Sequence, residues 1–132
     1  MNKKTIFPTE YQEEIWKKVK KFIAEKILPD ENIIEIVVTG SMVTKQLGEY
    51  DKKIVKPFYE RKFSDIDLLI SVKKDFKPKE DWQVLRKSGE PSEIGNTSSY
   101  ILTWIDDKFP VVALVFEKSI EKAKGDVVLY KK

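Results

Sequence analysis

The chain has 132 residues, of which 41% are hydrophobic and 36% charged, and it contains neither cysteine nor histidine. This composition excludes disulfides, zinc sites built from Cys and His, and nucleophilic catalysis that needs an imidazole base. The formal charge of +3 comes from 25 basic and 22 acidic residues, an excess too small to indicate nucleic-acid binding by itself.

The first predicted element is an amphipathic helix over residues 9–28. Its apolar residues recur at helical spacing, with Glu and Lys between them. Thr9 and Gln12 have the spacing of a capping box at the start of this helix. Leu28 ends the pattern because it precedes Pro29.

A buried strand is predicted next, over residues 33–39, because this segment is short and rich in β-branched residues. Gly40 and Ser41 break the strand, and a short helix follows over residues 42–47. The charged residues 49–62 predict a surface loop or an irregular insertion.

The second half of the chain predicts one helix and several strands. Residues 66–72 form the second strand, and a helix begins at Pro78, includes Trp82 and Leu85, and ends near Gly89. The remaining segments are a loop over residues 90–98, the two strands of a hairpin over 100–105 and 111–116, and a last strand over 127–130.

These elements predict a single domain, residues 1–132, with an α/β (α+β) fold in which helices pack against a mixed β-sheet. No apolar run approaches 18 residues, and residues 1–10 lack the apolar core of a signal peptide. We therefore expect no membrane span and a cytoplasmic location. Abundant Lys, Glu and Ile without Cys or His are typical of heat-adapted proteins.

Gly40 and Ser41 lie directly between the first predicted strand and the short helix. A glycine lets a ligand approach the backbone closely, and the unpaired N–H groups at the start of a following helix suit an anion. Taken alone, the dipeptide is better explained as a turn with a serine N-cap.

Asp65 and Asp67 begin the second predicted strand. Residues i and i+2 of a strand point to the same face, so these carboxylates project together, with Ile66 and Leu68 on the other face. Two adjacent carboxylates repel each other unless a cation lies between them, and oxygen ligands suit Mg²⁺ or Mn²⁺. A pair of solvated aspartates explains the pattern equally well.

Together, the two motifs resemble the signature of the nucleotidyltransferase superfamily, which has the DNA polymerase β-like fold. That signature is a hydrophobic strand, Gly-Gly or Gly-Ser, a spacer, and then Asp-hydrophobic-Asp-hydrophobic. The matching segments are Val37-Val38-Thr39-Gly40-Ser41 and Ser64-Asp65-Ile66-Asp67-Leu68-Leu69-Ile70. Residues 126–130 also look like the terminal strand of minimal nucleotidyltransferases, so the resemblance covers about residues 33–130.

The resemblance implies an enzyme that uses a nucleoside triphosphate and Mg²⁺ or Mn²⁺. Gly40 and Ser41 would contact phosphate, and Asp65 and Asp67 would be metal ligands and catalytic residues. The implied reaction is an in-line displacement on the α-phosphate, with a protein or RNA hydroxyl as the acceptor.

The sequence departs from this family in the spacer before Asp65, which is about twice the usual length. The extra residues fall at about 48–63. The basic residues of this insertion could contact phosphate or RNA, or could lie on a solvated loop: Lys52, Lys53, Lys56, Arg61 and Lys62.

A second departure concerns the third carboxylate that the family supplies from a later strand. In the best matching segment, 110–116, Ala113 stands at the expected position. Glu117, Asp106 and Asp107 are unconvincing replacements. The alternative function is therefore a catalytically weak or inactive relative that acts as a nucleotide-binding module or as a regulatory, partner-binding module. An unrelated α/β domain with a chance motif is a third possibility.

The acceptor has no obvious binding domain in this chain. Larger members add a helical domain for this purpose, and small members often work with a helical protein partner, so the resemblance implies a helical partner, an RNA acceptor or a homodimer. Trp82, Trp104 and Tyr100 could stack on a base, although aromatic residues at such positions more often belong to the core.

Overall fold

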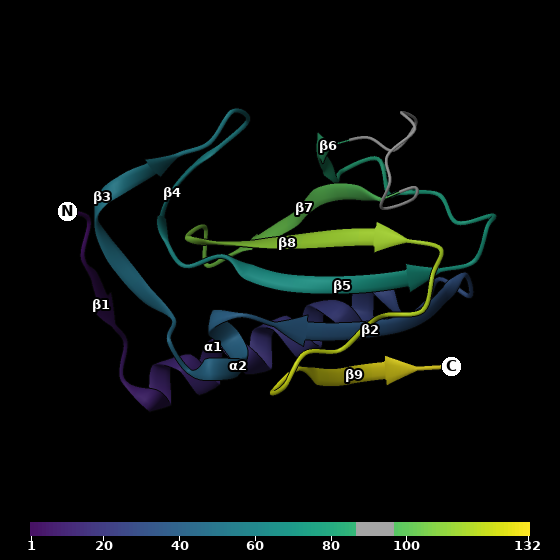
Figure 1. Cartoon of the computed structure of the whole chain (residues 1–132), viewed down its shortest axis with the longest axis horizontal. Coiled ribbons are helices and arrows are strands. Elements are labelled where there is room, and N and C mark those ends of the chain that lie inside the picture. The colour runs from purple at the N-terminus through teal and green to yellow at the C-terminus, as the bar shows by residue number, and fades with distance from the viewer. Residues whose placement is uncertain (87–96) are drawn as a thin grey trace.

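The computed structural model describes residues 1–86 and 97–132, and it shows a mixed α+β fold that consists mostly of sheet (Figure 1). One main helix covers one face of a large sheet, and a small sheet stands at one end of it. The elements follow in the order β1 (Lys4–Ile6), α1 (Thr9–Phe22), the π-helical turn η1 (Ile23–Ile27), β2 (Ile33–Thr39), α2 (Ser41–Thr44), β3 (Gly48–Val55), β4 (Glu60–Phe63), β5 (Ile66–Val72), β6 (Gln83–Arg86), β7 (Ser98–Ile105), β8 (Phe109–Phe116) and β9 (Val127–Lys131).

The large sheet has the strand order β6-β7-β8-β5-β2-β9 within the described residues. All neighbouring pairs in it are antiparallel except β5 and β8, which are parallel. The expected mixed sheet is therefore confirmed, as are the strand at 66–72 and the hairpin formed by β7 and β8. The arrangement brings the end of β2 and the starts of β5 and β8 to the same end of the sheet (Figure 1).

The core lies between the helix and one face of the large sheet. Ile15, Val19 and Ile27 are fully or almost fully buried there, against the alternate residues Ile66 and Leu68 of β5. This is the stripe that the helical spacing predicts. On the opposite face of β5, Asp67 and Leu69 are only partly buried, whereas Ser71 at its far end is buried.

The connection between β8 and β9 covers part of that opposite face. The hydroxyl of Ser71 donates a 2.6 Å hydrogen bond to the carbonyl of Lys118. Nζ of Lys122 lies 2.8 Å from Oε2 of Glu35, an ion pair that lacks hydrogen-bond geometry. The uncovered part therefore lies toward the other end of β5, beside the small sheet.

The small sheet has the order β1-β3-β4, and it corrects the expectation of a loop over residues 49–62. A hairpin forms instead, and β1 pairs with β3 at its base. Gly48 is required there, because a Cβ at this position would collide with the carbonyl oxygen of Thr5. The insertion thus has a defined position beside the large sheet.

The helix expected from Pro78 to Gly89 is also wrong over its described part. Gln83–Arg86 forms the edge strand β6, which pairs with β7. Trp82 is buried against Phe76 and Tyr100, so packing at the sheet edge prevails over the helical spacing. Residues 87–96, which include the predicted helix end and most of the predicted loop at 90–98, lie outside the described residues.

The start of α1 differs from the expected capping box. Pro8 is the N-cap, and no side chain caps the helix. The amide of buried Gln12 instead donates to the carbonyl of Phe7 at 2.8 Å and accepts from the N–H of Leu47 at 3.2 Å. Gln12 therefore ties α1 to the segment after α2.

In the described part of the chain, no helix is long and apolar enough to cross a membrane.

Candidate functional site

Gly40 ends β2 in a backbone conformation that only glycine adopts readily, with φ +74° and ψ −146°. A Cβ built on this residue would lie 2.7 Å from Oδ2 of Asp67, and it would meet Cγ of the same side chain at 3.6 Å. The strand pairing explains this closeness, since Thr39 lies opposite Asp67 in the β2–β5 ladder. The structure thus brings the Gly-Ser motif and the aspartate pair together.

Ser41 begins α2, which is a single turn ending at Thr44. The carbonyl of Gly40 accepts hydrogen bonds from the N–H groups of Val43 and Thr44, at 3.0 and 3.1 Å. The short helix that the sequence predicts is therefore present, although it starts one residue earlier and ends before residue 47. One turn has little dipole, so any phosphate contact here depends on individual backbone and hydroxyl groups.

Asp65 and Asp67 lie on the face of β5 opposite the helix, as the alternation predicts. Ile66, between the two aspartates, and Leu68, after them, point into the core and are 0% and 1% exposed. Asp65 precedes the strand and Asp67 is its second residue, so both carboxylates stand at the open end of the sheet. Their side chains are neither fully buried nor fully exposed.

The environment of Asp67 disfavours a negative charge. Burial first, and then the neighbouring Asp65, raise the pKa of this carboxyl to about 6, while Arg61 partly opposes both effects. Such a group ionises more readily when a cation approaches, and a shifted pKa beside a specific charged partner is one mark of a functional site.

Arg61 of β4 is the cation next to this pair. Its Nη2 atom lies 3.9 Å from Oδ2 of Asp65, and its side chain is only 9% exposed. Nη1 donates a 3.0 Å hydrogen bond to the carbonyl of Phe63, and the guanidinium lies 5.4 Å from the ring centre of Tyr50. The buried Nε atom has no hydrogen-bond partner.

Two aromatic residues border the site. Tyr59 precedes β4, and burial together with Asp65 raises the pKa of its phenol while Arg61 lowers it. Its ring contacts that of Trp104 edge-on, with 6.2 Å between centroids. Trp104 is half-buried, whereas Trp82 and Tyr100 belong to the core, which leaves Trp104 as the aromatic candidate with an accessible surface.

The register of β5 and β8 corrects the position of the expected third carboxylate. Ala113 lies beside Leu68 and is fully buried, so its side chain enters the core rather than the site. The neighbour of Asp67 on the shared face is Val112. A carboxylate at position 113 would therefore enter the core, because a shift of one residue along a strand reverses the face.

None of the alternative carboxylates replaces this group. Asp106 and Asp107 form the β7–β8 turn with positive φ, and Asp106 pairs with Lys18 at 2.7 Å. Glu117 follows β8 at the far end of the sheet and is exposed. Over residues 1–86 and 97–132, no three Asp, Glu, His or Cys side chains gather closely enough to hold a metal ion.

The donor set therefore suits one divalent cation rather than two. Asp65 and Asp67 offer oxygen atoms from one face of a strand, and burial together with Asp65 raises the pKa of Asp67, so a cation beside the pair would favour the ionised form. A hard cation held here would need further oxygen ligands from water or phosphate.

The sequence indicated only some of the hairpin residues that lie at the site. Arg61 belongs to the basic residues that the sequence suggested for phosphate or RNA contact, and it is the member of that group whose side chain is held at the carboxylates. The others lie on exposed strand and turn positions, with Lys53 near Glu60 and Lys62 near Glu49. Tyr59 carried no sequence signal.

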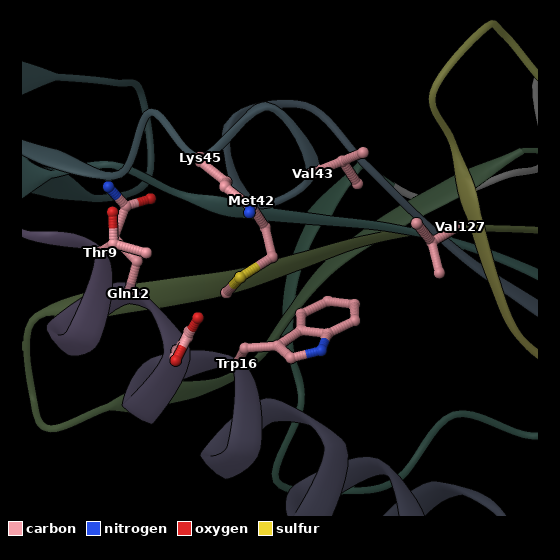
Figure 2. A pocket seen from close by; sticks show the side chains of 8 residues that line it. Thr9, Gln12, Trp16, Met42, Val43, Lys45 and Val127 are labelled. Carbon is pink, nitrogen blue, oxygen red and sulfur yellow. The ribbon is translucent and has the colours of Figure 1, made fainter.

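A separate pocket of about 200 Å³ lies between α1 and α2. Figure 2 shows the side chain of Met42 pointing from α2 toward Trp16 of α1, with Val127 at the rim. Met42 belongs to the core on the helix face of the sheet, whereas the aspartates lie on the other face. This apolar pocket is therefore distinct from the carboxylate site.

No protein-family model, curated protein or solved structure matches this chain.

Proposed function

We propose that this protein binds the phosphates of a nucleoside triphosphate together with Mg²⁺ or Mn²⁺ and transfers a nucleotidyl group to a protein or RNA hydroxyl. The contact between Gly40 and Asp67 carries this proposal. Because Gly40 has no side chain, its backbone lies directly beside the carboxylate of Asp67, and this closeness supports a shared binding site.

In this site, Asp65 and Asp67 would hold the cation, and the cation would neutralise charge on the phosphates. Gly40 keeps the space beside Asp67 open, because any larger residue would contact the carboxylate. The hydroxyl and N–H of Ser41 would bind phosphate oxygens. These roles agree with the resemblance to nucleotidyltransferases.

The acceptor is proposed to be an RNA or a protein hydroxyl, brought by a helical partner protein or by a second copy of the chain. We place the reaction in the cytoplasm, where nucleoside triphosphates and Mg²⁺ are available. A chain without cysteine is compatible with that compartment.

A second candidate function is nucleotide binding without efficient transfer. Val112 beside Asp67 favours it, because the side chain next to the metal-binding pair offers neither a ligand nor a proton acceptor. Loss of a positioned acid or base typically lowers a rate by about 10²–10⁴-fold.

Calorimetric titration with Mg-ATP tests the binding site. Wild type should bind, and Asp65→Asn and Asp67→Asn should each weaken binding by tenfold or more, roughly the effect of one charge-assisted contact. Asp75→Asn, on the exposed β5–β6 connection, is the matched control that should bind like wild type. Equal binding by all four proteins would refute the site.

Incubation with α-labelled ATP, Mg²⁺ and cell extract then separates the two functions. Labelled protein or RNA that disappears with the Asp65→Asn/Asp67→Asn double variant supports transfer. Nucleotide binding without any such label supports the second candidate.

A further inference from the structure

We propose that Arg61 is a phosphate-binding residue of this site, which serves as the counter-ion of the carboxylate pair when no ligand is bound and pairs with a phosphate of the metal–nucleotide when it is. This inference extends the proposed function and rests on it, because the phosphate is brought by the metal-bound nucleotide. It assigns a ligand contact to the inserted hairpin.

The side chain of Arg61 is largely buried and restrained by its neighbours, unlike that of a solvated surface arginine. Its side chain is 9% exposed, its Nη1 atom is fixed by the carbonyl of Phe63 at 3.0 Å, and the ring of Tyr50 supports the guanidinium. A side chain restrained in this way loses little further freedom when it binds a ligand.

The protein uses the donors of Arg61 only in part: Nη1 donates to the carbonyl of Phe63, and the guanidinium lies close enough to the phenol of Tyr59 to oppose the rise in the pKa of that group. Nη2 lies 3.9 Å from Oδ2 of Asp65, which is an ion-pair separation and too long for a hydrogen bond. Nε is buried and has no partner. An unsatisfied buried donor of a cation is costly, and the planar guanidinium is suited to two parallel hydrogen bonds with a phosphate.

The charges around Arg61 explain why it would change partners. Asp65 and Asp67 carry the negative charge that the guanidinium now partly compensates. A divalent cation bound by the same carboxylates would take over that compensation, and the phosphates attached to it would bring negative charge toward Arg61. Arg61 should therefore oppose a bare cation and favour a cation that carries phosphate.

Opposite effects on two ligands test this role. We compare Arg61→Gln, Arg61→Lys and wild type in titrations with Mn²⁺ alone, Mn-tripolyphosphate and Mn-ATP. Arg61→Gln should bind Mn²⁺ alone about threefold more tightly or better, because a repelling charge is gone. It should bind both phosphate ligands about tenfold more weakly or worse, because a charge-assisted contact is lost.

Arg61→Lys keeps the charge but lacks Nε and the planar fork. It should bind Mn²⁺ alone like wild type and bind both phosphate ligands more weakly. The matched control is Lys62→Gln, which removes one positive charge from the adjacent residue, whose side chain is 43% exposed and faces Glu49. This control should bind all three ligands like wild type.

The outcomes separate the inference from the proposed function. Wild-type Mn-ATP binding that neither Arg61 variant changes, or parallel losses for Mn²⁺ and the phosphate ligands, overturns the role of Arg61 and leaves the proposed function standing. Arg61-dependent binding of Mn-tripolyphosphate without binding of Mn-ATP supports Arg61 and refutes a nucleotide ligand. Absence of phosphate-ligand binding in wild type refutes both.

Folding is checked by circular dichroism and thermal melting. If Arg61→Gln does not fold, Arg61→Lys carries the test, since its predicted pattern of unchanged Mn²⁺ binding and weaker phosphate binding differs from a general loss.

Discussion

Gly40 and Asp67 lie so close together that a Cβ on Gly40 would be 2.7 Å from Oδ2 of Asp67. Gly40 directly follows β2 and Asp67 lies in the neighbouring strand β5, so their closeness joins two motifs that are distant in the sequence. Any substitution at Gly40 therefore changes the backbone conformation and the position of a carboxylate together.

Gly40→Ala should destabilise the protein by about 2–4 kcal/mol, from the strained φ and ψ and the contact with Asp67. Gly125→Ala is the control for strain alone. Gly125 has φ +94°, but the nearest atom to its added Cβ is Cγ1 of Val43 at 4.0 Å, so about 1 kcal/mol is expected. Urea denaturation measures both, and equal losses would contradict the close approach.

The raised pKa of Asp67, about 6 against an ordinary 3.8, predicts how stability depends on pH. Between these values the folded protein retains a proton that the unfolded chain has released. Stability therefore falls as pH rises through this window, and the loss is complete above about pH 6. Asp67→Asn removes this loss, so it should exceed wild type by about 1–3 kcal/mol at neutral pH and match it near about pH 4.

Urea denaturation in a chelator at both pH values measures this difference. Asp75→Asn, which removes an exposed carboxylate, should follow wild type throughout. A stability gain for Asp67→Asn that is the same at both pH values would show that the effect does not come from ionisation. With saturating Mn²⁺, wild type should gain stability and the Asp67→Asn variant should gain less.

The register of β5 and β8 predicts opposite outcomes for two neighbouring substitutions. Val112→Asp adds a third carboxylate beside Asp67, which should lower stability by about 1–3 kcal/mol without a cation and tighten Mn²⁺ binding. Ala113→Asp places its charge in the core beside Leu68 and should cost about 4 kcal/mol or more, with no rescue by Mn²⁺.

Thermal melts with and without Mn²⁺ distinguish the two variants. Rescue of Ala113→Asp and not of Val112→Asp would mean that the faces are reversed. A rise in labelled product with Val112→Asp would further favour nucleotidyl transfer over nucleotide binding alone.

The buried side-chain amide of Gln12 should contribute to the stability of the fold, because it makes two hydrogen bonds. Gln12→Leu keeps the volume but leaves the carbonyl of Phe7 and the N–H of Leu47 without their partner, so a loss of about 2–3 kcal/mol is expected. Gln46→Leu, at an exposed position of the same segment, is the control and should change stability little. Equal melting temperatures would show that solvent replaces the amide.

The strands that carry the motifs were predictable because their signal is local. Residues 33–39 and 66–72 alternate or run apolar between turn residues, and this pattern also set the shared face of Asp65 and Asp67. The closeness of Asp67 to Gly40 was expected only because the family resemblance implies it.

The remaining features depend on partners elsewhere in the chain. The hairpin of β3 and β4 is charged and largely exposed, so it has no apolar alternation to reveal it. The strand β6 exists because it pairs with β7. The face of Ala113 depends on the register with β5, and a shift of one residue reverses it.

The charged groups of the candidate site and one phenol lie within residues 59–67: Tyr59, Arg61, Asp65 and Asp67. The remainder of the fold contributes the backbone of Gly40, the hydroxyl of Ser41 and the sheet register. The charged groups are therefore supplied by one continuous segment of the chain. Transfer of this one segment into another sheet, with a glycine at the end of the facing strand, would carry the guanidinium and the two carboxylates together, whatever the surrounding fold.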